Sequence, residues 1–128
     1  MRTSFATSSA VSVVASRLGL VWSPNMQDWA VEVADEHRVF EFSRALSAAS
    51  KTEEKVCMLD LVLASVDEWM LAHEPVERAE IVDISRRLRP LIGPALREFS
   101  DVAEYWVGND FPAAEVVRAI LSETEDPC

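Results

Sequence analysis

Carboxylate side chains recur at a regular interval in the middle of the sequence. Four of them are spaced seven residues apart, at Glu53, Asp60, Asp67 and Glu74, and Glu68 directly follows the third. Because seven residues make almost two helical turns, these carboxylates would form a slowly drifting stripe along one side of a helix. A stripe of negative charge can meet a basic partner surface, where complementary charge speeds association and sets specificity. The candidate partner-binding residues are therefore Glu53, Asp60, Asp67 and Glu68.

Two other interpretations of this acidic stripe are open at this point. The acids could simply be the narrow solvated face of an otherwise apolar helix. Alternatively, Asp60 or Asp67 could form a half-buried salt bridge with Arg44 or with an arginine of segment 86–89. The salt-bridge interpretation places part of the stripe beneath a neighbouring segment, whereas the other two leave it exposed.

Motifs that would indicate catalysis are absent from the sequence. It contains no GxGxxG, Walker or GxSxG pattern, and its three glycines are too few for a loop that cradles phosphate. His37 and Glu41 are four residues apart on one predicted helix face, but a helical di-metal site uses Glu-x-x-His motifs, and none occurs. We therefore predict no enzyme, no catalytic residue, no metal and no cofactor. The enzymatic alternative is a metal or small-ligand site at His37 and Glu41.

The charge balance restricts the class of partner. Twelve basic residues stand against 22 acidic residues, for a formal charge of −10 over 128 residues. A chain must neutralise phosphates with lysine and arginine to hold nucleic acid or an anionic membrane, so neither is an expected direct partner. No apolar run approaches the roughly 18 residues of a membrane span. We expect a soluble cytoplasmic protein whose macromolecular partner is basic.

The N-terminal segment differs in charge from the rest of the chain. Residues 1–27 contain two arginines and no acid, so the segment 28–128 holds every acidic residue. We interpret 1–27 as an acid-poor extension and 28–128 as a single helical domain. Other interpretations of 1–27 are a processed targeting segment, a start site placed ahead of a true start at Met26, and an edge strand or short helix packed on the domain.

Apolar spacing predicts an all-α fold, an irregular bundle of about five helices. The expected helices are 35–49, 52–73, one from Pro75 to a break at Pro90, one from Pro94 to a turn at 108–110, and one from Pro112 to a frayed acidic tail beginning at Ser122. Segment 29–33 alternates loosely and is β-branched, so it predicts one short strand or extended segment. The 52–73 helix is apolar over most of its circumference, which is typical of a central helix covered by neighbours.

Tryptophan and cysteine residues add expectations about packing. Trp69 and Trp106 fall on apolar helix faces and are predicted core residues. Trp22 and Trp29 lie in the less regular N-terminal part, where they could anchor an interface or pack that part onto the bundle. Two cysteines are too few for a disulfide scaffold, so Cys57 is expected to be a reduced core thiol.

Two stretches of the sequence resemble small acidic bacterial proteins. The first contains Glu41-Phe42, Lys55-Val56-Cys57-Met58-Leu59 and Leu63-Ala64-Ser65-Val66-Asp67, and the second contains Tyr105-Trp106, Asp110-Phe111-Pro112 and Val116-Val117-Arg118. Proteins of this kind resemble immunity proteins of bacterial toxin systems, which bind and neutralise a cognate toxin. The resemblance implies no catalytic residue, and residues 1–27 fall outside it.

The leading hypothesis is a small acidic inhibitor of the immunity type. Its acidic helical face would occlude the basic active site of a partner such as a toxin or nuclease. The alternative from a different class is a structural or adaptor bundle that self-associates without catalytic activity.

Overall fold

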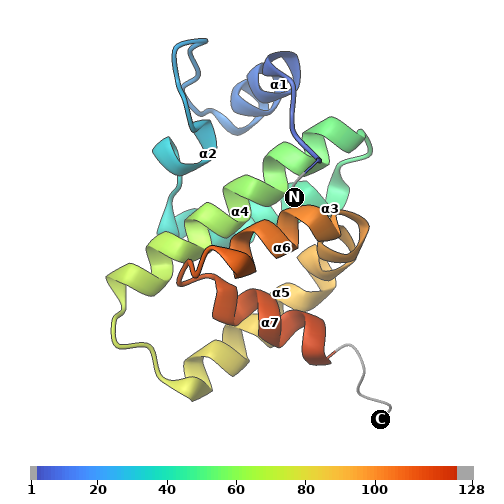
Figure 1. Ribbon diagram of the computed structural model, residues 1–128. Helices are drawn as coiled ribbons and strands as arrows, with labels where there is room; N and C mark the ends of the chain where they lie inside the picture. Colours follow the sequence, from blue (N-terminus) through green and yellow to red (C-terminus); the bar gives the residue numbers. More distant parts are fainter. Residues whose placement is uncertain (1–2, 124–128) are drawn as a thin grey trace.

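The computed structural model describes residues 3–123, and every regular element among them is helical (Figure 1). A short 3-10 turn, η1 (Glu36–Arg38), leads into α3 and is capped by Asp35, which accepts a hydrogen bond from the backbone N–H of His37 at 2.9 Å. In chain order the α-helices are α1 (Ser8–Leu18), α2 (Trp29–Glu32), α3 (Val39–Ala48), α4 (Thr52–Ala72), α5 (Arg78–Glu98), α6 (Ser100–Gly108) and α7 (Ala114–Glu123).

Helix α4 is the central element of the bundle. Its side chains at Leu59 and Leu61 are fully buried although they point to nearly opposite sides of the helix. Helices α1, α2, α3, α5 and α6 all contact it, and α7 packs against α5 and α6 (Figure 1). The expectation of a central helix at 52–73 is therefore confirmed. None of the helices in residues 3–123 has the length and apolar content needed to cross a membrane.

The all-α prediction is confirmed, but the number of helices differs. The described residues form seven α-helices rather than about five, and they contain no strand. The strand or extended segment expected at 29–33 is wrong, because Trp29–Glu32 is the short helix α2. A lone strand would leave its backbone groups unpaired. One helical turn pairs them locally, as when the Val33 N–H donates to the Trp29 carbonyl at 3.0 Å.

The break expected at Pro90–Pro94 is also wrong, because α5 runs through both prolines. Its buried positions keep helical spacing on both sides of them, so packing favours one continuous helix. Pro90 and Pro94 are both exposed and are four residues apart, so the carbonyls that lose an N–H partner lie where water can reach them. Between them, Gly93 is buried, and a Cβ there would lie 3.8 Å from Ile120 of α7.

The first helix packs directly on the central one. Val14 and Ala15 of α1 are buried in the core, and Arg17 forms a salt bridge with Glu54 of α4 at 2.9 Å. The described part of residues 1–27 thus includes a short helix docked on the bundle, which was one of the alternatives for this segment. A boundary at residues 27 and 28 stays a prediction. The frayed end was expected from Ser122 onward, but Ser122 and Glu123 belong to α7, and residues 124–128 lie outside the described residues.

Candidate functional site

The structure places the four predicted partner-binding residues in two different environments. Glu53, in the first turn of α4, and Glu68, near its C-terminal end, are exposed. Asp60 and Asp67 are half-buried because α6 packs over the first and the start of α7 over the second. The acids of the stripe that lie on α4 are therefore not equally accessible, and Glu74 lies beyond the end of the helix at Ala72.

Asp60 joins α4 to α6. Its Oδ1 accepts a hydrogen bond from the indole Nε1 of Trp106 at 3.0 Å. Trp106 is a core residue, as predicted, and its ring packs at 4.6 Å between centroids on Phe111. A buried indole N–H needs an acceptor, and Asp60 supplies it. This aspartate therefore has a structural role in addition to any role at the surface.

Asp67 joins α4 to the start of α7. Its Oδ1 accepts a hydrogen bond from the backbone N–H of Ala113 at 2.9 Å, and Ala113 is fully buried. The first N–H groups of a helix have no partner within the helix, so this carboxylate satisfies a donor that would otherwise lack one. Burial raises the pKa of Asp67 above its usual range, and the charge of Glu68 adds to that increase, against the lowering effect of the Ala113 hydrogen bond.

Two of the arginines suggested as partners for the stripe form ion pairs on their own helix. Arg86 and Arg87 form ion pairs with Asp83 on their own helix, at 2.7 and 3.8 Å. The guanidinium of Arg87 also lies 4.3 Å from the ring centroid of Phe40 on α3. Arg86 and Arg87 lie in the middle of α5, which continues to Glu98.

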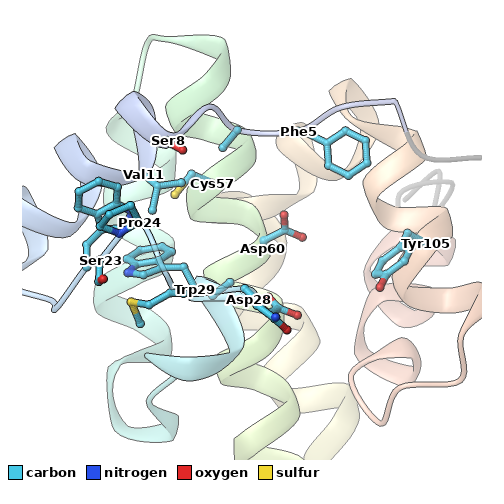
Figure 2. A pocket seen from close by; sticks show the side chains of 15 residues that line it. Phe5, Ser8, Val11, Ser23, Pro24, Asp28, Trp29, Cys57, Asp60 and Tyr105 are labelled. Carbon is cyan, nitrogen blue, oxygen red and sulfur yellow. The ribbon is translucent and has the colours of Figure 1, made fainter.

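A cleft opens over the middle of α4, where Asp60 lies. Its volume is about 430 Å³, and its walls come from the N-terminal strap (residues 3–7), α1, the α1–α2 connection, α2, α4 and α6. Six side chains define its chemistry: Phe5, Trp22, Asp28, Trp29, Asp60 and Tyr105. No lysine, arginine or histidine is among the described residues that line it. Figure 2 shows Asp28 and Asp60 on one side of the opening and Tyr105, from α6, on the other.

Hydrogen bonds hold the walls of this cleft in place. The Trp29 indole Nε1 donates to the Val21 carbonyl at 2.7 Å, which ties α2 to the connection before it. Thr3 and Ser4 of the strap donate to the carboxylate of Asp101 on α6, the Thr3 backbone N–H at 2.7 Å. Although desolvation opposes it, this set of hydrogen bonds lowers the pKa of Asp101 below its usual range.

The sequence did not predict this cleft. It indicated that Trp22 and Trp29 anchor an interface or pack the N-terminal part, and the structure shows Trp29 buried and Trp22 half-buried in the cleft wall. Asp28 and Tyr105 were not among the candidate site residues. Asp28 is the first acid of the chain and stands next to Trp29, and this pairing was the one sequence signal that could have pointed to the cleft. Tyr105 gave no such signal, because it reaches the cleft only through the packing of α6.

Cys57 lies in the cleft wall as an unreactive thiol. It is free, as predicted, and its side chain is only 3% exposed. Burial, with smaller contributions from the charges of Asp60 and Glu54, raises the pKa of Cys57 to about 12. The thiolate is the nucleophilic form of cysteine, so this group is not activated for covalent chemistry at neutral pH.

The pair considered for metal binding lies outside the cleft. Glu41 accepts a hydrogen bond from Arg38, with 2.6 Å between Nη2 and Oε2, and this contact lowers the pKa of Glu41. His37 is exposed. Across residues 3–123, no three or more His, Cys, Asp or Glu side chains are grouped so that they could hold a metal ion.

A second concavity lies on the opposite flank of α6. It is a shallow groove of about 710 Å³ between α5, α6 and α7, and the apolar side chains in it are Leu96, Ala103, Val107 and Leu121. Arg97 and Arg118 lie at its edges. This groove thus has apolar walls and basic edges, whereas the cleft has acidic and aromatic walls.

Comparison of the chain with protein-family models, with curated proteins and with solved structures finds no match. The resemblance to immunity-type proteins therefore stays a prediction.

Proposed function

We propose that this chain is a small acidic binding protein that inhibits a basic protein partner, in the manner of a cytoplasmic immunity protein. The observation that supports this most is that Glu53 and Glu68 are both exposed on α4, in a chain whose formal charge is −10. These two side chains present carboxylates at the surface of the central helix.

Inhibition would follow from occlusion of the partner's active site. The formal charge of −10 attracts a basic surface over a distance of about one Debye length, which raises the rate of encounter. At contact, the exposed glutamates face the basic residues around the partner's active site and exclude its substrate. A nuclease or another toxin with a phosphate-binding site has such a basic surface, because it must neutralise phosphate.

The test is capture of the partner followed by an inhibition assay. The tagged protein is incubated with its native cell lysate at low and high salt, and proteins retained in stoichiometric amount are identified by mass spectrometry. The retained partner is then purified and assayed with and without this protein. We expect a basic partner that is released at high salt and whose activity is lost in the complex.

Charge-reversed variants make the test specific to the acidic face. The double variant Glu53→Lys/Glu68→Lys is compared with Glu104→Lys/Glu115→Lys, which changes the net charge equally at exposed positions on α6 and α7. We expect the first to slow association about tenfold or more and the second to have a smaller effect. Equal association rates for both variants, or a retained partner whose activity is unchanged, would contradict the proposal.

The alternative function is self-association as a structural bundle. The apolar groove between α5, α6 and α7 favours it, because apolar side chains at Leu96, Val107 and Leu121 line one continuous concavity. Analytical ultracentrifugation over a hundredfold concentration range distinguishes the two functions. A monomer mass at every concentration would count against self-association.

A further inference from the structure

We propose that the groove between α5, α6 and α7 binds an amphipathic helix of a second, acidic protein, with the apolar face of that helix on the groove floor and its carboxylates against Arg97 and Arg118. This inference goes beyond the proposed function, because it assigns a further partner, of opposite charge, to a surface that contains neither Glu53 nor Glu68. Figure 1 shows α5 and α7 on the side of α4 away from α1 and α2.

The floor of the groove is apolar where α5 and α6 meet. Leu96 of α5 and Ala103 of α6 are buried beneath it, and Val107 of α6 is half-buried and faces the opening. At the end of α6, Gly108 adds no side chain, and a Cβ there would meet no heavy atom within 4 Å. The floor therefore offers apolar contact surface, with open space where α6 ends.

The shape of the groove favours a helix as its occupant. A shallow groove leaves one side of the occupant in water, so the occupant needs one apolar face and one polar face, as an amphipathic helix has. Helix α6 has nine residues and is therefore roughly 13 Å long, which matches about two to three turns of a helix laid along it. Recognition of this kind places apolar anchors of the bound helix, at i, i+3, i+4 and i+7, into the groove.

Two arginines give the groove a charge opposite to that of the chain. A Cβ added at Gly93 would lie 3.7 Å from Nη1 of Arg97 and 3.8 Å from Ile120, so this guanidinium lies near the contact between α5 and α7. Arg118 is exposed on α7, and neither arginine forms an ion pair with another residue of 3–123. With Glu104 as its one carboxylate, the described lining carries a net charge of +1, in a chain of −10. Carboxylates of a partner would form charge-assisted hydrogen bonds with both guanidinium groups.

The position of Glu104 restricts the occupant further. Because Glu104 lies on α6, the acidic residues of the bound helix face α5 and α7, and its side toward α6 is uncharged. A second copy of this chain matches the apolar floor but not the charges. In a two-fold symmetric dimer the same surface meets itself, so a lining of +1 would face another of +1.

A designed peptide tests the groove without the natural partner. The probe is a lactam-bridged helical peptide of about 14 residues, roughly four turns, with leucine at i, i+3, i+4 and i+7 and glutamate on both flanks. The control peptide has lysine in place of each glutamate. Calorimetry of the full chain measures affinity, and methyl resonances locate the site. We expect saturable shifts at Val107 with the acidic peptide, and none at Val13 of α1, which is 42% exposed and lies outside the groove.

Variants of the rim test the charge. Arg97→Gln and Arg118→Gln should each weaken binding of the acidic peptide about threefold, and the double variant about tenfold, since exposed ion pairs are lost. Arg44→Gln/Arg86→Gln changes the net charge equally at exposed positions outside the groove and should have a smaller effect. Binding of the lysine peptide as tight as that of the acidic peptide, or equal affinity in both double variants, would overturn the proposal.

A variant of Gly108 tests the floor. The open space at this residue admits a larger side chain, so Gly108→Trp should retain the fold and fill the end of the groove. We expect it to weaken binding of the acidic peptide about tenfold or more, as the loss of one buried anchor does. Gly108→Ala is the matched control and should bind like the unmodified protein. Far-UV circular dichroism verifies that both variants are folded, and unchanged affinity in folded Gly108→Trp would contradict the assigned site.

Two further measurements separate this inference from the other functions. Glu53→Lys/Glu68→Lys should bind the acidic peptide at least as tightly as the unmodified protein does, because neither glutamate lines the groove. If the acidic peptide does not bind but a basic partner is still inhibited, the groove inference is wrong and the proposed function stands. If sedimentation shows a dimer that Gly108→Trp abolishes and the acidic peptide does not dissociate, a second copy occupies the groove and the inference is wrong.

Discussion

The four acids at seven-residue intervals, together with the neighbouring Glu68, belong to two structural classes. The inner acids, Asp60 and Asp67, accept hydrogen bonds from Trp106 and Ala113 and thereby hold α6 and the start of α7 against α4. The outer acids, Glu53, Glu68 and Glu74, are exposed. The comparison shows that one periodic pattern can serve two purposes, because α6 and the start of α7 meet α4 at Asp60 and Asp67.

The inner and outer acids also differ in side-chain length. Both inner acids are aspartates, and the three outer acids are glutamates. A short aspartate places its carboxylate close to α4, where it can meet a backbone N–H or an indole from a helix packed above it. A longer glutamate extends into solvent, where it can meet a partner's lysine or arginine. Asp60 belongs to both descriptions, because it also lines the cleft.

The largest effect on stability is expected at Asp67. Asp67→Ala leaves the N–H of Ala113 buried without an acceptor, which should lower the free energy of unfolding by about 1–3 kcal/mol. Asp67→Asn should lower it less, because its amide oxygen can still accept. Urea denaturation of the two variants measures the difference. Equal losses of stability would show that the hydrogen bond to Ala113 is not what makes this residue structural.

A smaller loss is expected at Asp60. Asp60→Ala removes the acceptor of the Trp106 indole and should lower the free energy of unfolding by about 1 kcal/mol, since Trp106 keeps a slight exposure of 4% whereas Ala113 has none. The indole N–H resonance of Trp106 should shift in Asp60→Ala and stay near its position in Asp60→Asn. An unshifted resonance in Asp60→Ala would break the distinction between inner and outer acids at this site.

The pH dependence of stability should distinguish Asp67 from other carboxylates. Burial raises the pKa of Asp67 in the folded state above its ordinary value of 3.8, so the folded state binds a proton more readily than the unfolded state does. The contribution of Asp67 to stability should therefore fall as pH rises from 3.8 through the raised pKa. The difference in unfolding free energy between the unmodified protein and Asp67→Asn, measured from pH 3 to 7, should decrease over that window.

The stability contribution of Asp101 should change with pH in the opposite direction to that of Asp67. Desolvation tends to raise its pKa, but the hydrogen bonds from Thr3 and Ser4 outweigh this effect, and its folded pKa lies below the ordinary value. Its contribution is complete above pH 3.8 and is lost as pH falls below that value. Asp101→Asn, measured in parallel, should therefore show a stability difference from the unmodified protein that shrinks toward low pH. The same trend for both aspartates would contradict the assignment.

The smallest effect on stability is expected at the outer acids. Glu53→Gln and Glu68→Gln should each change the free energy of unfolding by less than about 0.5 kcal/mol, because both side chains are exposed. Thermal denaturation checks this, with Asp67→Ala as the reference for a large loss. A loss above 1 kcal/mol at either glutamate would show that the outer acids also hold the fold.

Local patterns were sufficient to predict much of the fold. The helix at 52–73 follows from apolar residues at three- and four-residue intervals, and it lies at the centre as its nearly complete apolar circumference indicated. The all-helical class, the buried thiol of Cys57 and the core position of Trp106 follow from similar local arguments. Each depends on residues close together in the chain, so their spacing carries the information.

Other features depend on residues that are far apart in the chain. Whether Pro90 and Pro94 break a helix depends on α7, which packs on Gly93 and makes a continuous α5 favourable. The difference between the inner and outer acids depends on where Trp106 and Ala113 lie relative to α4. The cleft requires the N-terminal strap, α2 and α6 to meet over one helix.

The sequence alone determined the all-helical class, the central helix, the charge and the period of the acids, because helical propensity, apolar spacing and formal charge are properties of neighbouring residues. Only the tertiary structure decided which carboxylates are covered and which are exposed, and that Asp28, Asp60 and Tyr105 share one cleft. The physical reason is that burial and hydrogen-bond partners arise when separate helices pack together, and a helix's own sequence does not contain the positions of its neighbours.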